Sequence, residues 1–142
     1  MLANQLNFGI PNVELQWSCG GTVNPGCFAG HQLVVLFLPV DPRQLAEELD
    51  SYAACADEFG GSDAWFLAIG QGRADQAARF RTTPIAIDRD GAAWQAFNRL
   101  AKRKLDRAEG ATFLFTRGGS LHRVWPGRGH APEVLAELLT RA

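Results

Sequence analysis

The chain has 142 residues, of which 46% are hydrophobic and 20% are charged, a composition typical of one globular domain with a sizeable core. No apolar run approaches the roughly 18 residues that a membrane-spanning helix needs. A formal net charge of −1 gives no electrostatic reason to expect nucleic acid or an anionic membrane as a partner. We therefore expect a single domain over residues 1–142.

The N-terminus and the cysteines bear on the cellular compartment. Residues 1–6 contain neither the basic region nor the apolar region of a secretory signal, so a cytoplasmic location is the default expectation. Three cysteines, Cys19, Cys27 and Cys55, are an odd number, and at least one thiol must be unpaired within the chain. In a reducing compartment all three would normally be free.

The first quarter of the chain predicts a short edge strand or hairpin. Residues Val13–Trp17 alternate apolar and polar side chains, the pattern of a half-buried strand, and Gly20-Gly21 follows as a turn. The segment Thr22–His31 contains Asn-Pro-Gly and a further glycine. It is therefore interpreted as a loop or a short return strand.

The next stretch predicts a central strand that leads directly into a helix. Leu33–Leu38 is a continuous apolar run, which indicates a strand buried on both faces. After Pro39, Asp41 suits the N-cap and Pro42 suits the first helical position. The helix is predicted to continue to the glycine pair at 60–61, with an apolar face at spacings of three and four formed by Leu45, Leu49, Tyr52, Ala56 and Phe59.

Two further strands and a short helix are predicted between residues 64 and 88. Ala64–Ile69 is a second continuous apolar strand, and Gly70–Gly72 is expected to turn the chain into a short helix over Ala74–Phe80. Thr83–Asp88 is a short strand that ends in an Asp-Arg-Asp-Gly turn. Apolar strands that alternate with helical segments favour a parallel sheet.

The last third predicts a helix, a β-hairpin and a terminal helix. The apolar face of the first helix spans Ala93–Ala101, and the basic residues beside it are interpreted as a solvated face that complements the helix dipole: Arg99, Lys102, Arg103, Lys104 and Arg107. Ala111–Phe115 and Leu121–Trp125 flank Gly118-Gly119 as a hairpin. The terminal helix carries an apolar stripe of Val134, Leu135, Leu138 and Leu139. Together these elements predict a mixed-sheet α/β sandwich.

Three segments resemble the peroxiredoxin branch of the thioredoxin fold, the alkyl hydroperoxide reductase and thiol-specific antioxidant family. Gly30–Pro39 is similar to the family's apolar approach to its active site, Pro84–Gly91 to its Pro-(apolar)-Asp-x-Asp-Gly segment, and Ala111–Phe115 to its hairpin strand. The resemblance covers nearly the whole chain. It implies a thioredoxin-like α/β fold, with a mixed central sheet flanked by helices.

The resemblance also implies an active site that has lost its chemistry. The family motif is Pro-x-x-x-Thr-x-x-Cys, in which the cysteine thiolate attacks the peroxide. Pro39 matches the proline, but Arg43 stands at the threonine position and Ala46 at the cysteine position. Gly110 stands where the family has an arginine. A thioredoxin-type dithiol is also missing, because the chain has no Cys-x-x-Cys and Ala111 falls at the cis-proline position.

The remaining candidate residues leave alternatives open. Cys19 and Cys27 flank a glycine-rich turn that could bring them within disulfide distance, although the sequence favours two unconnected thiols because it does not fix the Cα separation. Cys55 is interpreted as a small packed side chain of the long helix. Arg43 lies in a first helical turn, where the dipole disfavours a cation. The positive charge of Arg43 is balanced either by the Asp41 carboxylate or by an anionic ligand.

Two functions follow from these residues. The first is a peroxiredoxin-like binding or interaction module without peroxidase activity, whose binding site lies at Pro39, Arg43 and Ala46. The second is a thiol-disulfide oxidoreductase or antioxidant protein that uses Cys19 and Cys27 as its catalytic residues. The histidines show no metal-ligand spacing, so neither a metal nor a cofactor is expected. The sequence identifies no partner and leaves a homodimer open.

Overall fold

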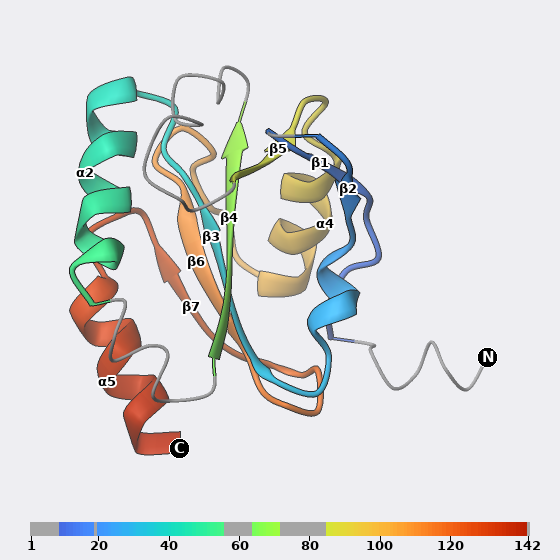
Figure 1. The fold of residues 1–142 in the computed structure, drawn as a ribbon, viewed down its shortest axis with the longest axis vertical. Helices are drawn as coiled ribbons and strands as arrows, with labels where there is room; N and C mark the ends of the chain where they lie inside the picture. Colours follow the sequence, from blue (N-terminus) through green and yellow to red (C-terminus); the bar gives the residue numbers. More distant parts are fainter. Residues whose placement is uncertain (1–8, 19, 56–63, 72–84, 142) are drawn as a thin grey trace.

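Strand β3 (Gln32–Phe37) lies at the centre of the sheet, and all six of its residues are buried. In the computed structural model the residues described are 9–18, 20–55, 64–71 and 85–141. Within these residues seven strands form one sheet in the order β2-β1-β5-β4-β3-β6-β7 (Figure 1). The other strands are β1 (Leu15–Trp17), β2 (Thr22–Val23), β4 (Ala64–Gln71), β5 (Ile85–Asp88), β6 (Ala111–Phe115) and β7 (Leu121–Pro126).

The sheet is mixed, as predicted. Strands β3, β4 and β5 run parallel to one another, whereas β6 is antiparallel to β3 and to β7. At the opposite edge β1 pairs antiparallel with both β5 and β2. The three strands predicted to be central, in the segments Leu33–Leu38, Trp65–Ile69 and Ala111–Phe115, are therefore neighbours, and that prediction is confirmed.

Helices cover both faces of the sheet. Helices α2 (Pro42–Ala53) and α5 (Ala131–Arg141) lie on one face and α4 (Ala92–Ala101) lies on the other (Figure 1). A short 3-10 helix, η1 (Pro25–Phe28), precedes β3. Side chains of β3 alternate between the two layers: Leu33, Val35 and Phe37 pack toward α4, while Val34 and Leu36 pack toward α2 and α5. This alternation explains why the strand is apolar at every position.

Helix α2 begins where the sequence predicts and ends earlier. Asp41 is the N-cap, and its Oδ1 accepts a hydrogen bond from the backbone N–H of Arg43 at 3.1 Å. The helix ends at Ala53, and the N–H of Cys55 donates to the carbonyl of Tyr52 in a tightened last turn. Cys55 therefore follows the helix, and its prediction as a helical residue is wrong. The predicted continuation through Ala56 and Phe59 lies outside the described residues.

Three other predictions on secondary structure need comment. Gly70 and Gln71, predicted to turn, instead extend β4 because they pair with Ile87 and Asp88 of β5. The short helix predicted over residues 74–80 lies outside the described part of the chain. Leu139, predicted in the apolar stripe of the terminal helix, is 52% exposed, whereas Val134 and Leu138 are fully buried.

Candidate functional site

The carboxyl end of β3 is the point at which the chain order of the sheet reverses. From β3 the chain passes to β4 on one side, and it later returns to β6 on the other side. In open α/β sheets ligands bind in the crevice at such a reversal. The residues next to it are Leu38, whose N–H donates to Ile69 O at 2.9 Å, buried Pro39, and Val40, whose N–H donates to Ala108 O at 3.0 Å. The turn before β6 is thereby fixed against the turn that leads into α2.

The first two turns of α2 carry two of the three predicted binding residues. Arg43 is exposed and Ala46 is partly buried. The Asp41 carboxylate caps the backbone of Arg43, but no ion pair forms between the two side chains in the described residues. The contact between Asp41 and Arg43 is therefore a helix cap, in which the Asp41 side chain accepts from the backbone N–H of Arg43.

Gly110 packs directly against the β3–α2 turn. Its φ is +80°, a left-handed conformation that disfavours every residue with a β-carbon. A β-carbon built on Gly110 would lie 2.2 Å from the carbonyl oxygen of Phe37 and 3.2 Å from the nitrogen of Pro39. No side chain fits at this position without a movement of the backbone. The structure thus places Gly110 beside Pro39 and gives a steric reason for the glycine.

A buried glutamine and an arginine complete this edge of the sheet. Gln71, at the end of β4, is 5% exposed. Its Nε2 donates to Leu38 O at 3.1 Å and to Arg107 O at 2.8 Å, and its Oε1 accepts from Arg107 Nε at 2.5 Å. Arg107 was predicted to belong to a solvated basic helix face. That prediction is wrong, because α4 ends at Ala101 and Arg107 is partly buried in the turn before β6.

The two described cysteines lie in different parts of the fold. Cys27 is a free, exposed thiol in η1, and Cys55 is a free, partly buried thiol that packs against the core beneath α2. Cys19 lies outside the described residues, so the Cys19–Cys27 pairing stays a prediction.

Two buried polar residues of α2, Glu48 and Tyr52, lie on the side of the helix that faces the sheet. Glu48 is 3% exposed; its Oε1 accepts from the N–H of Gly129 at 2.9 Å, and burial raises the pKa of its carboxyl group. One turn later the hydroxyl group of Tyr52 lies 3.1 Å from Oγ1 of Thr112. Burial also raises the pKa of Tyr52, which keeps the phenol neutral. These contacts join α2 to β6 and to the loop before α5.

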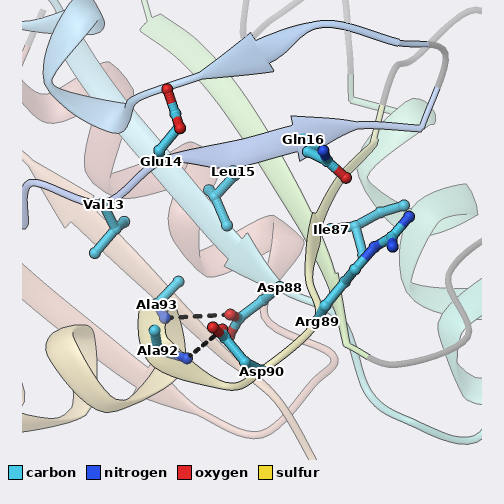
Figure 2. A pocket seen from close by; sticks show the side chains of 10 residues that line it. All are labelled: Val13, Glu14, Leu15, Gln16, Ile87, Asp88, Arg89, Asp90, Ala92 and Ala93. Atoms are coloured by element: carbon cyan, nitrogen blue, oxygen red, sulfur yellow. Dashed lines mark hydrogen bonds between the residues drawn. The ribbon is translucent and has the colours of Figure 1, made fainter.

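A surface cavity of about 310 Å³ lies elsewhere on the same edge of the sheet. It is lined by β1 and its approach, the end of β5 and the start of α4 (Figure 2). The Asp88 carboxylate accepts from Ala93 N and Trp94 N at 3.2 and 2.9 Å, and Asp90 accepts from Ala92 N at 3.1 Å. The first amides of α4 are therefore already occupied. In the described residues no group of three or more histidine, cysteine or acidic side chains is arranged to hold a metal.

Comparison with solved structures identifies the fold. Peroxiredoxin Q of Xanthomonas campestris is similar with a TM-score of 0.74 and 28% identity, over 91% of this chain and 91% of that chain. The chain is peroxiredoxin-like. The Xanthomonas campestris bacterioferritin comigratory protein, whose description names alkyl peroxide reduction, is similar at TM-score 0.74 and 28% identity, over 99% of this chain and 94% of that chain.

More distant structures show the thioredoxin fold alone. The exposed lipoprotein thioredoxin of Streptococcus pneumoniae is similar at TM-score 0.69 and 16% identity, over 92% of this chain and 99% of that chain. No family model matches the sequence, and no curated protein is similar enough to count as a match. In the described part of this peroxiredoxin-like chain no helix is long and apolar enough to cross a membrane.

Sequence reasoning missed the Gln71–Arg107 pair. The two residues are 36 positions apart, and each was assigned to a different local feature, a turn and a helix face. The available signal was the polar side chain of Gln71 only two residues after the apolar run 64–69, where it extends a buried strand. A buried amide needs hydrogen-bond partners.

Proposed function

We propose that this peroxiredoxin-like chain binds a ligand or partner at the carboxyl end of β3 and does not reduce peroxides. The binding residues are Pro39, Arg43 and Ala46 with the neighbouring turn before β6. Peroxide reduction in the family depends on a cysteine thiolate near the N-terminus of the helix after the conserved proline. Here the residue that matches this cysteine in the motif is Ala46.

The geometry around Ala46 supports this proposal. Ala46 lies in α2 shortly after the Asp41 cap, where helix amides would stabilise a thiolate. Cys55 follows the end of that helix, and at about 1.5 Å rise per residue the helix alone separates the two positions by more than 10 Å. The motif position of the family arginine holds Gly110, whose surroundings exclude a side chain. The chain therefore supplies neither a cysteine nor an arginine at these two motif positions.

The test is a peroxidase assay of the purified protein with hydrogen peroxide and an organic hydroperoxide in the presence of a thiol reductant. We expect no turnover above the buffer rate. The Ala46→Cys variant should gain a thiol that alkylates faster than Cys55, because it lies near the helix N-terminus and Arg43. It should nevertheless gain little peroxidase activity, since the arginine position stays empty.

Three serine variants, Cys19→Ser, Cys27→Ser and Cys55→Ser, are the matched controls. Robust turnover by the unmodified chain that one of these changes abolishes would overturn the proposal. Large activity in Ala46→Cys alone would show that the sulfur is the one missing component.

The alternative is a thiol-disulfide oxidoreductase that uses Cys19 and Cys27. One observation favours it: the Cys27 thiol is exposed and free. Thiol titration of the oxidised and reduced protein distinguishes the two functions. Loss of two reactive thiols on mild oxidation, reversed by dithiothreitol and absent in Cys27→Ser, would favour the oxidoreductase.

A further inference from the structure

We infer that Arg107 binds an oxyanion, a carboxylate or a phosphate group, at the carboxyl edge of β3 and β4. This inference rests on the proposed binding function and names the chemical class of its ligand. Arg107 reaches this edge from the turn before β6, the same turn that places Gly110 against Pro39.

The guanidinium group is held in one orientation. Its Nε donates to Gln71 Oε1 at 2.5 Å, and the buried Gln71 amide is itself fixed by Leu38 O and by the backbone carbonyl of Arg107. Every polar atom of the Gln71 side chain is therefore used to hold this turn and this arginine. A guanidinium fixed through Nε directs its two terminal nitrogens together, which is the geometry that recognises two oxygens of one oxyanion.

The other face of the guanidinium lies against Gly91. A β-carbon built on Gly91 would be 2.9 Å from Nη1, 3.2 Å from Cζ and 3.3 Å from Nη2 of Arg107. The absence of a side chain at Gly91 leaves room for the cation at the junction of β5 and α4. The last residue of β4, the turn after β5 and the turn before β6 thus converge on one side chain.

Within the described residues no acidic side chain neutralises the charge of Arg107. No carboxylate of the described residues lies within the 4.0 Å ion-pair distance of its guanidinium, and the terminal nitrogens have no hydrogen-bond partner there. The nearby Asp88 and Asp90 carboxylates instead accept the backbone N–H groups of α4. A partly buried cation that retains free donors is most stable when an anion accepts from them.

The test is a titration of the ¹⁵N-labelled full chain with inorganic phosphate and, separately, with acetate. Sodium chloride at equal ionic strength controls for screening. We expect the Arg107 Nε–H resonance and the Gly91 amide to shift saturably with millimolar affinity, up to about 50 mM anion, and not to shift in this way with chloride. The relative affinities for phosphate and acetate distinguish the two ligand sources.

Variants separate binding from structural support. Arg107→Gln should weaken anion binding at least tenfold, whereas Arg103→Gln removes the same charge from an exposed position and should leave it unchanged. Gln71→Ala keeps the charge but frees the side chain, so a severalfold loss is expected. Arg107→Lys retains the charge but lacks the two terminal nitrogens of the guanidinium group, so it should bind the anion more weakly than wild type. This variant tests the site if Arg107→Gln does not fold.

Two results would overturn the inference. One is the lack of a saturable shift at Arg107 in the wild-type chain with either oxyanion. The other is equal weakening by Arg107→Gln and Arg103→Gln, which would indicate general electrostatics. Neither result depends on peroxide turnover, so failure of this inference is distinguishable from failure of the proposed function.

Discussion

Replacement of Gly110 by alanine tests the steric argument that no side chain fits beside the β3–α2 turn. The new β-carbon would meet the carbonyl oxygen of Phe37 at 2.2 Å, a backbone atom of the central strand that no rotamer change can move. The φ of +80° adds a second cost, because a β-carbon is disfavoured in the left-handed region. Both effects act at the turn that joins β3 to α2.

The expected loss of stability is the sum of these two effects. The left-handed conformation costs about 1–2 kcal/mol for a residue with a β-carbon, and forced movement of a packed backbone costs about 1–3 kcal/mol. Gly110→Ala should therefore lower the free energy of unfolding by about 2–5 kcal/mol. With a urea m-value of about 1–3 kcal/mol/M, the midpoint of unfolding followed by circular dichroism should fall by at least about 0.7 M.

Gly127→Ala is the matched control. Gly127 has a φ of +75°, but a β-carbon there would have no atom within 4 Å. It should show only the conformational cost of about 1–2 kcal/mol. Equal destabilisation by the two variants would refute the steric argument, and an arginine at position 110 would then be sterically acceptable. In that case the double variant Ala46→Cys with Gly110→Arg becomes the natural test for recovery of peroxide reduction.

Two further predictions concern the polar groups behind α2. Burial raises the folded-state pKa of Glu48. The stability contributed by its protonated form is therefore present below about pH 4.3 and is lost as pH rises through the folded-state pKa. In urea unfolding between pH 4 and 7.5, Glu48→Gln should gain stability relative to wild type, and a relative loss over that range would contradict this. Tyr52→Phe and Thr112→Val should each cost about 1–2 kcal/mol, because each removes the hydrogen bond between these two buried hydroxyl groups. The double variant should cost less than the sum of the two, and strict additivity would show that the 3.1 Å contact contributes nothing.

The sequence predicts those parts of the fold in which one local pattern has one structural solution. A strand that is apolar at every position must be covered on both faces, and β3 is covered by α4 on one side and by α2 and α5 on the other. Asp41 followed by Pro42 specifies a helix start through hydrogen-bonding geometry that is local to the backbone. The order of these patterns was enough to indicate the peroxiredoxin-like fold.

Features that depend on distant partners could not be predicted in this way. Gly70 and Gln71 extend β4 only because Ile87 and Asp88 supply hydrogen bonds. Arg107 resembles its basic neighbours in sequence and differs from them by its bond to Gln71. The end of α2 at Ala53 has a local cause, the tightened turn in which Cys55 N–H donates to Tyr52 O. The apolar spacing continues past Ala53 and does not indicate this end.

The arrangement of the edge also explains how binding chemistry could change while the fold stays the same. The geometry of this edge is set by the reversal of strand order at β3 and by the backbone contacts of Val40 and Gly110, none of which requires a cysteine. The charge at this edge comes instead from side chains on the surrounding turns. In the proposed site a cation, Arg107, is fixed by the buried end of β4 and does not depend on the helix dipole of α2 or on a thiolate for its orientation. The chemical class of the ligand at this edge therefore depends on which turn carries the charged side chain and holds it in place. Gln71→Ala should accordingly change ligand affinity without changing the order of the strands.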